Sequence, residues 1–596
     1  MFNIKRCNPG MGALLVASFA LVGCAPRTNV STTANVPAQY SHAFMSVQEI
    51  WLNTSATATP DDTTWAKYPL QTPVTVDLAS SMEGQLTALT TGLNVPIGTY
   101  AQLRLIPVDP SATVLASATA LGAQYNSEVD YTDTAGNAQR LRLELLNPDR
   151  GIGIPTSIQV TGTGYNILSS SPTSTTSSST SSSTSSTSTT AKPFSIAINV
   201  DGARDLLPFA YAATDTLGTN AVSGFLLNPH MTAYDGSQVG AIQGTVNVAG
   251  LDATTITTQS ASGFYDIQVT AESLSTDGTR HVAVNSAPVR SDGTFTLYPL
   301  SSSSTTPTSY DLVIHGPAIA TVIIKGVTVN VGDPATTTPV NVGTITARAA
   351  SSFQVTLDTT NPLPAGASVG FYQTLPGATE VPYVVELKAV DPFTRAFPTN
   401  WPVKVSSASI DYGTFSSSGS TIALATSDPT EGASTYRLAA TAPLFTDGPL
   451  TSTTTTTLTG TTTTAVTVPL VNKANSATAA LVPTLIPASG TTAFATFNVS
   501  QTNTFTNGSL IVSHDGGIVA TASLDAALAR SGTSTLTVTG IPAGSGLLGT
   551  TTSGLYYVSV RVWKSSDPAN TVVREIYSTA LDLRSATSAV YNLTIN

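Results

Sequence analysis

Histidine is the side chain most often used as a general base or a metal ligand near neutral pH. The chain has five histidines, widely separated in the sequence: His42, His230, His281, His315 and His514. No two of them have the one-turn spacing that places two ligands on one face of a zinc-binding helix. We therefore expect single histidines on separate strands and loops, with no metal centre and no shared catalytic site.

Two glycine-containing stretches match motifs of catalytic or nucleotide-binding proteins. Residues 366–370, Gly-Ala-Ser-Val-Gly, match the nucleophile elbow, which needs a strand before the serine and a helix after it. Residues 544–549 match the dinucleotide fingerprint, whose third glycine opens a helix. Neither stretch is followed by a helical pattern, so we expect both matches to be coincidental.

Tryptophan side chains could offer flat faces to sugar rings, although large aromatics of β-sandwiches are more often in the core. The candidates for ligand stacking are Trp51, Trp65, Trp401 and Trp563. The carboxylate pair of a glycoside hydrolase is defined by a three-dimensional separation, and the sequence gives no positive sign of one. We therefore predict no catalytic residues, no metal and no cofactor.

The elements that must position these residues are mainly short strands. Thr99–Leu105 and Arg140–Leu145 alternate apolar and polar side chains, which is typical of half-buried strands. Asp-Gly pairs, which favour tight turns between strands, occur at 201–202, 235–236, 277–278, 292–293 and 515–516. Only Ser80–Thr91 and Ala520–Ala529 have helical spacing. The pattern predicts an all-β chain of several antiparallel sandwiches, immunoglobulin-like or transthyretin-like, in series.

Composition excludes one class of partner. The 596 residues carry a formal net charge of −11, and only 10% of them are charged. A charge-poor acidic surface repels phosphate backbones, which are bound by clustered lysine and arginine. We therefore expect no nucleic-acid binding.

The amino terminus is laid out as a secretory signal peptide. Lys5 and Arg6 precede the apolar run Met11–Val22, which is too short to span a bilayer. The last two residues of this run, Leu21 and Val22, are followed by Gly23 and Cys24. Together the four residues resemble the lipobox of bacterial lipoproteins. An ordinary secretory signal that happens to contain a cysteine is the alternative.

The lipobox resemblance implies cleavage before Cys24 and acylation of its sulfur. Three acyl chains would then hold the protein at the membrane. Ala25, in place of aspartate, implies the outer membrane by similarity to Gram-negative sorting. The only other cysteine, Cys7, lies in the part that would be removed, so the mature chain would have no disulfide and no thiol chemistry.

Residues 24–39 lack an apolar pattern and are predicted to be a tether. Residues 40–235 resemble a bacterial lipoprotein domain of unknown function, a β-sandwich that often follows a lipobox. The stretches that carry this resemblance are Val47–Trp51, Thr75–Leu78, Pro96–Leu105 and Leu227–Met231. The tract 169–191, almost wholly Ser and Thr, is predicted to be a disordered insertion, with a glycosylated stalk as the alternative.

The remainder divides into three predicted domains. Residues 236–348 are similar to the carboxypeptidase-regulatory-like, transthyretin-like module, through 240–246, 291–297 and 310–314. Residues 349–475 and 476–596 are predicted to be two further β-rich domains. The combination indicates a non-catalytic, lipid-anchored protein of the cell envelope that binds or spaces, with envelope polysaccharide or another surface protein as its contact. A surface glycan hydrolase and a structural subunit of an envelope assembly stay open as alternatives.

Overall fold

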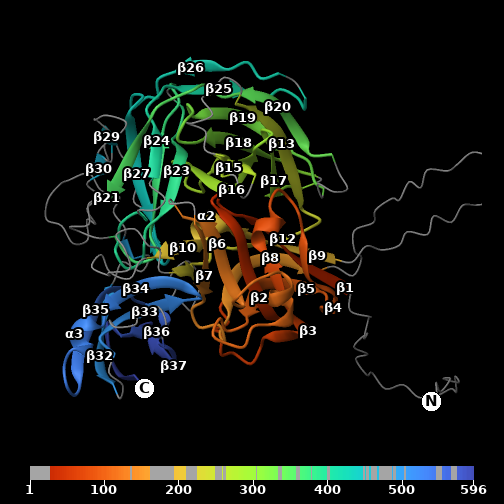
Figure 1. Cartoon of the computed structure of the whole chain (residues 1–596). Helices are drawn as coiled ribbons and strands as arrows, with labels where there is room; N and C mark the ends of the chain where they lie inside the picture. The colour runs from red at the N-terminus through yellow and green to blue at the C-terminus, as the bar shows by residue number, and fades with distance from the viewer. Residues whose placement is uncertain are drawn as a thin grey trace, which may run out of the picture.

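The chain folds almost entirely into β-strands, arranged as four sandwiches that lie against one another (Figure 1). The fold is taken from a computed structural model. It describes residues 27–133, 137–160, 194–209, 224–248, 251, 258–259, 263–303, 305–332, 338–357, 363–377, 379–398, 403–419, 421–446, 450, 455–457, 466–468, 486–487, 492–501, 505–544, 554–564 and 573–595. Within these ranges, no helix has the length and apolar character needed to cross a bilayer. The all-β prediction is confirmed.

The N-terminal sandwich packs a sheet of order β12-β9-β1-β4 against an eight-stranded sheet of order β10-β11-β7-β6-β2-β5-β8, in which β3 also pairs with β2. One apolar core fills the space between them. Its elements are β1 Arg27–Asn35, β2 Tyr40–Asn53, β3 Ala66–Asp77, the 3-10 turn η1 Leu78–Ser81, β4 Thr87–Asn94, β5 Gly98–Pro107, α1 Ala116–Ala120, β6 Ser127–Thr132, β7 Ala138–Glu144, β8 Ile152–Val160, β9 Phe194–Asp201, α2 Gly202–Asp205, β10 Leu206–Phe209, β11 Gly224–Leu227 and β12 Thr232–Asp235.

The second sandwich packs the sheet β17-β13-β20 against a sheet that begins β14-β15-β18-β19, with β16 paired to β15. Its core is separate from that of the first. Its strands are β13 Val239–Asn247, β14 Thr258–Gln259, β15 Phe264–Leu274, β16 His281–Arg290, β17 Thr294–Ser301, β18 Thr308–His315, β19 Val322–Val329 and β20 Val340–Thr346.

The third sandwich packs β24-β21-β30 against β23-β22-β27-β29. Two further strands from this region of the chain belong to the sheet of the second sandwich. β25 pairs in parallel with β19, so β25 and β26 extend the sheet of the second sandwich. The strands of this region are β21 Ser352–Leu357, β22 Ser368–Gln373, β23 Tyr383–Ala389, β24 Val403–Ser406, β25 Ile410–Thr414, β26 Ala425–Ser427, β27 Thr435–Thr441, β28 Phe445–Thr446, β29 Thr455–Thr457, β30 Val466–Val468 and β31 Ile486–Pro487.

The C-terminal sandwich packs β35-β32-β38 against β34-β33-β36-β37 around its own core. In Figure 1 it lies beside both the N-terminal and the third sandwich. Its elements are β32 Thr492–Gln501, β33 Asn507–His514, β34 Gly517–Ser523, α3 Asp525–Leu528, β35 Ser534–Pro542, β36 Leu555–Trp563, β37 Val573–Asp582 and β38 Ser588–Ile595.

All four sandwiches use the same plan in their smaller sheet. The first strand of each sandwich, β1, β13, β21 or β32, has an antiparallel neighbour on one side. On its other side it pairs in parallel with a strand that comes late in the same sandwich, namely β9, β20, β30 or β38. Each sandwich is thus closed by joining its beginning to its end, an internal repeat that the sequence does not show.

The predicted tether at 24–39 is wrong for most of its length, because Arg27–Asn35 form strand β1 in the middle of a sheet. The segment is rich in Thr and Asn, yet most of these residues are buried. Two of the buried hydroxyls find partners inside the sandwich: Thr33 donates to the carbonyl of Ser81 at 3.0 Å, and Thr32 donates to the carbonyl of Thr87 at 3.4 Å. β-branched threonine suits a strand, and once its hydroxyl is paired it can be buried at little cost.

The helices predicted at Ser80–Thr91 and Ala520–Ala529 form only in small part. Residues 78–81 make one 3-10 turn before β4, and Ala520 lies in β34, with only Asp525–Leu528 helical. Pairing of β4 with β1 and of β34 with β33 overrides the local helical spacing. Four of the Asp-Gly pairs lie in turns between successive strands, whereas Asp201-Gly202 opens the short helix α2.

Candidate functional site: a polar cavity between three sandwiches

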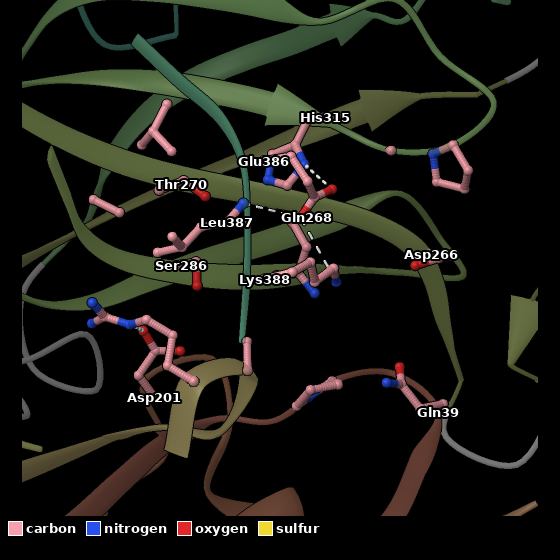
Figure 2. A pocket seen from close by; sticks show the side chains of 17 residues that line it. Gln39, Asp201, Asp266, Gln268, Thr270, Ser286, His315, Glu386, Leu387 and Lys388 are labelled. Carbon is pink, nitrogen blue, oxygen red and sulfur yellow. Dashed lines mark hydrogen bonds and ion pairs between the residues drawn. The ribbon is translucent and has the colours of Figure 1, made fainter. Parts of the chain in front are cut away.

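A cavity of about 80 Å³ lies where the N-terminal, second and third sandwiches meet (Figure 2). The second sandwich contributes β15, β16 and the end of β18, the third contributes β23, and the N-terminal sandwich contributes α2 and the turn after β1. The charged residues of its lining are Asp201, Arg204, Asp266, His315, Glu386 and Lys388. The cavity therefore holds both signs of charge and depends on the packing of three separate sandwiches.

Glu386 of β23 is the central group of this cavity. Its carboxylate lies 3.3 Å from Nδ1 of His315 and 3.7 Å from Nζ of Lys388, and it accepts a hydrogen bond from the amide of Leu387 at 3.2 Å. Burial alone would raise the pKa of Glu386, but Lys388 and His315 outweigh it and hold that pKa below its usual value. Glu386 in turn raises the pKa of Lys388.

On the side of α2, the cavity is lined by the ion pair of Arg204 and Asp201. Nε of Arg204 donates to Asp201 at 2.5 Å. Behind it Asp205, fully buried, accepts hydrogen bonds from the amides of Asp201 and His230 at 3.1 and 2.6 Å. Burial raises the pKa of Asp205, and the hydrogen bond from His230 counteracts this only in part. These contacts fix the helix against the cavity wall.

The cavity contains carboxylate, imidazole and ammonium groups, which are the side-chain types that act as acids and bases. A nucleophile must lie within hydrogen-bond reach of its base, and no hydroxyl of the described residues hydrogen-bonds to His315. Gln268 brings the buried oxygen Oε1, which has no hydrogen-bond partner within the described ranges. A cavity of about 80 Å³ holds a few water-sized groups, whereas pockets for larger ligands have volumes of roughly 300 Å³ or more. The arrangement suits a hydrated ion-pair junction between sandwiches.

The sequence did not single out Glu386, Lys388 or Asp201 as site residues. The signal was present in β23, where Glu386 and Lys388 interrupt an otherwise apolar strand. Charges on the buried side of a strand need partners from a neighbouring element, and those partners come from a sandwich more than 70 residues away in sequence. The spacing within β23 therefore marks an interface without identifying its other half.

Three of the candidate stacking residues are buried. Trp51 and Trp65 pack together with ring centroids 6.1 Å apart, and Nζ of Lys67 covers the Trp51 ring at 3.7 Å. Trp563 lies in a cluster where three sandwiches meet. Rings that are 5–6% exposed cannot stack on a sugar, so the stacking prediction is wrong for these three. Trp401 lies outside the described residues.

The other candidate residues are not brought together. Each histidine contacts a different partner: His42 lies 2.8 Å from Asp77, and the ring of His281 stacks on Tyr383 at 3.9 Å. Ser368 is buried in β22 with no helix behind it, which is incompatible with a nucleophile elbow. The described residues contain no group of three or more His, Cys, Asp or Glu arranged to hold a metal ion.

The lipobox residues Leu21, Val22, Gly23 and Cys24 lie outside the described ranges, as does the Ser/Thr tract at 169–191. The first described residue, Arg27, begins β1. The structure therefore leaves the acylation of Cys24 and the disorder of the tract as predictions.

Three solved structures align with long stretches of the chain, but the aligned backbones superpose poorly. The Bacillus anthracis TIE protein is 7% identical, with 93% of this chain and 68% of that chain covered and a TM-score of 0.14. A streptococcal ancillary pilin is 11% identical, covering 60% and 99%, with a TM-score of 0.13. BcpA, the major pilin subunit of Bacillus cereus, is 10% identical, covering 60% and 99%, with a TM-score of 0.12. TM-scores this low carry no information about function.

No curated protein matches the chain. The similarity of residues 236–348 to the transthyretin-like module stays a prediction. The expected resemblance of the N-terminal sandwich is confirmed, because residues 28–198 match the family described as "Domain of unknown function (DUF4382)".

Proposed function

We propose that this chain is a non-catalytic, lipid-anchored protein of the bacterial cell envelope, in which four braced sandwiches act as a stiff spacer between the membrane and an outer partner. The observation that carries the proposal is the bracing itself. Sandwiches joined only by linkers move independently, whereas sandwiches that share sheets and buried ion pairs move as one body. A stiff spacer needs sandwiches that share sheets and buried ion pairs.

The N-terminal and C-terminal sandwiches are tied through one turn. Arg104, fully buried in β5, forms an ion pair with Asp515 in the β33–β34 turn, and the amide of Gly153 donates to the carbonyl of Asp515 at 3.2 Å. The amide of Ile518 donates to Oδ1 of Asn228 at 2.9 Å. These bonds join residues up to 411 positions apart and fix the two sandwiches at a defined angle.

An apolar cluster shared by three sandwiches supports the same contact. Leu207, Phe209 and Leu226 of the N-terminal sandwich pack with Ile518 and Trp563 of the C-terminal one. The third sandwich joins the cluster, which we call the three-sandwich cluster, through Ala365 and Phe393. Apolar burial of this kind gives the interface the character of a core, so the sandwiches resist separation.

The second and third sandwiches are joined by the strand pair β19–β25 and by polar contacts around it. Tyr383 donates its hydroxyl to Asp311 at 2.7 Å, and Lys325 pairs with Glu380 at 2.7 Å. Backbone pairing in register fixes both distance and orientation, which side-chain contacts alone do not.

One outer surface is suited to the partner. The side chains that point outward from the sheet β35-β32-β38 are all uncharged: Thr492, Phe494, Thr496, Asn498, Ser500, Thr535, Thr537, Thr539, Ser588, Val590, Asn592 and Thr594. Phe494 is 44% and Val590 71% exposed. Hydroxyls and amides can both donate and accept hydrogen bonds, and sugars offer the same groups in return. This outer face supports envelope polysaccharide as the contact.

The anchor is tested on the protein made in a Gram-negative host. Mass spectrometry of the wild type should show a chain that begins at Cys24 with its sulfur and amine acylated, and Cys24→Ala should carry no acyl group and leave the membrane fraction. A chain with an intact leader, or with a bare Cys24 sulfur, would remove the proposed anchor and with it the envelope location.

The partner is tested on the same acylated chain. We expect envelope polysaccharides on a glycan array to be retained without release of reducing ends, and Val590→Lys on the outer face to weaken retention several-fold. Leu121→Lys, a change at an exposed apolar residue of the N-terminal sandwich, is the matched control. Release of reducing ends would favour the surface hydrolase instead, and absence of both retention and release would favour a structural subunit of an envelope assembly.

A further inference from the structure

The first described strand begins very near the residue that we propose to be acylated. Arg27 opens β1 only three positions after Cys24. An extended chain spans at most about 3.6 Å per residue, so the Cα atoms of Cys24 and Arg27 are no more than about 11 Å apart. The headgroup zone on each side of a bilayer is of the order of 5–8 Å thick. With Cys24 acylated, the start of β1 therefore lies next to the membrane surface.

Strand pairing places a rigid turn at the same end of the sandwich. Arg27 pairs with Asn94, the last residue of β4, and the turn 95–97 leads directly into β5. Val95 is fully buried, and Tyr100 donates its hydroxyl to the carbonyl of Pro96 at 2.9 Å. The turn is thus held in one position from both sides.

That turn presents an isoleucine to solvent. Ile97 is 65% exposed, although the residue two positions before it is fully buried. A single exposed apolar side chain on a protein surface is ordinary. What distinguishes Ile97 is its location, at the one end of the sandwich that a three-residue connection from Cys24 can bring to the membrane.

Two side-chain contacts with the second sandwich lie at the opposite end of β1. Asn35, its last residue, hydrogen-bonds to Ser286 of the second sandwich, and Glu83 pairs with Arg290 nearby. In Figure 1 the strands β1, β4 and β9 are labelled on the side of the N-terminal sandwich that faces away from the C-terminal sandwich. The exposed residues at the start of β1 and in the turn 95–97, which we call the base, lie outside these two contacts.

We propose that this base, formed by Arg27, Pro96 and Ile97, contacts the headgroup region of the bilayer. Ile97 enters the interface, and the guanidinium of Arg27, which has no ion pair with any described residue, binds lipid phosphates. The inference rests on the proposed acylation of Cys24. It adds that the N-terminal sandwich lies directly against the membrane surface.

The cysteine content makes the test simple. Cys7 is lost with the leader and Cys24 is blocked by acylation, so a single introduced cysteine can be labelled selectively. Acylated full-length Ile97→Cys, labelled with an environment-sensitive fluorophore, is placed in vesicles of phosphatidylethanolamine and phosphatidylglycerol that contain a headgroup spin label. Leu121→Cys and Val590→Cys, both at exposed apolar positions away from the base, are the matched controls.

We expect the spin label to quench the fluorophore at position 97 several-fold more strongly than those at 121 and 590, and its emission to shift to the blue on binding to vesicles. Equal quenching at all three positions would overturn the base, and so would a position-97 label shielded without quenching, as in contact with a second copy. Mass spectrometry of the same samples separates the two proposals. Without an acyl group on Cys24 the anchor fails, whereas an acylated chain with a water-exposed label defeats the membrane contact alone.

Discussion

Asp130 shows how a buried charge is tolerated at the residue scale in this chain. It lies two positions after Glu128 on β6, so both carboxyl groups are on one face of the strand and both are buried. Burial, the hydrogen bond to Glu128 and the charge of Glu128 raise the pKa of Asp130 to about 7, against the opposing charge of Arg140. Asp130 is therefore protonated at mildly acidic pH in the folded chain.

The raised pKa sets the sign of a pH effect. The folded chain keeps a proton on Asp130 up to about pH 7, while the unfolded chain loses it near pH 4. The stabilisation is complete below about pH 4 and is lost as the pH rises towards 7. In Asp130→Asn we expect the urea midpoint of the transition that includes the N-terminal sandwich to change less between about pH 4.5 and pH 8 than in the wild type. Asp149→Asn, at an exposed site, should keep the wild-type dependence.

Asp515 gives a second prediction at this scale. Burial opposes its ionisation, but Arg104 and His514 lower the pKa of Asp515, so its stabilising effect is present above about pH 4 and lost as the pH falls through the lowered value. Asp515→Asn leaves Arg104 buried without its counter-charge. We expect a loss of roughly 1–3 kcal/mol in unfolding free energy at pH 7, reduced from the fully buried case because Asp515 is partly exposed.

A control substitution at an exposed ion pair distinguishes the loss of the Arg104–Asp515 contact from the loss of a surface charge in general. Asp582 pairs with Arg584 on the outside of the C-terminal sandwich, with both side chains more than a third exposed. Asp582→Asn should cost less than about 0.5 kcal/mol by the same denaturant measurement. Equal losses in the two variants would show that the Arg104 contact does not hold the sandwiches together.

At the element scale, β13 depends on a glycine at a close approach. A Cβ atom at Gly240 would collide with the carbonyl oxygen of Asn330, a backbone atom that cannot move aside easily. The residue lies in the strand that closes the second sandwich on itself. Glycine is required here by space and not by backbone conformation, since Gly240 has no positive φ.

Gly240→Ala should therefore destabilise the second sandwich by roughly 1–3 kcal/mol, as overpacking does, with a lower thermal midpoint. Gly98→Ala at the start of β5 is the control, because nothing lies within 4 Å of its added Cβ and its φ is not positive. That control should be neutral or slightly stabilising through loss of chain entropy in the unfolded state. A similar drop in both variants would contradict the packing account.

At the scale of the whole molecule, the sandwiches should unfold together. Ile518 is fully buried in the three-sandwich cluster and lies outside the C-terminal sandwich's own core, whereas its neighbour Val519 belongs to that core. The alternation of strand β34 thus sends one side chain to the interface and the next to the core. Substitutions at the two positions can separate coupling from stability.

We expect wild-type calorimetry to show coupled unfolding of the N-terminal and C-terminal sandwiches. Ile518→Ala should split the transition, because it weakens only their contact. Val519→Ala should lower the transition temperature while keeping it single, because it weakens the sandwich from within. Independent transitions in the wild-type chain would remove the support for a stiff spacer.

The sequence could be interpreted reliably where the information was local. Alternation predicted strands such as β5 and β7, and the Asp-Gly pair at 515–516 predicted the turn that carries Asp515. Composition and turn residues predicted the all-β class. These features depend on neighbours within a few positions, so the linear pattern holds them.

The sequence was misleading where distant partners decide the outcome. Arg27–Asn35 was predicted as a tether because its residues are polar, and it became a central strand because β4 and β9 supply partners on both sides. The cavity around Glu386 could not be predicted, since His315 and Asp201 reach it from other sandwiches. The buried indoles likewise became interior only through tertiary packing.

By itself the sequence determined the class of structure, and it predicts a chain that does not bind nucleic acid and a leader whose last residues resemble a lipobox. Only the tertiary structure decided which sandwiches touch, which charges face one another and where the first strand begins relative to Cys24. The physical reason is the sequence separation over which each kind of interaction acts. Strand alternation and turn preference act between neighbours in the chain, whereas ion pairing, shared sheets and burial act between residues hundreds of positions apart.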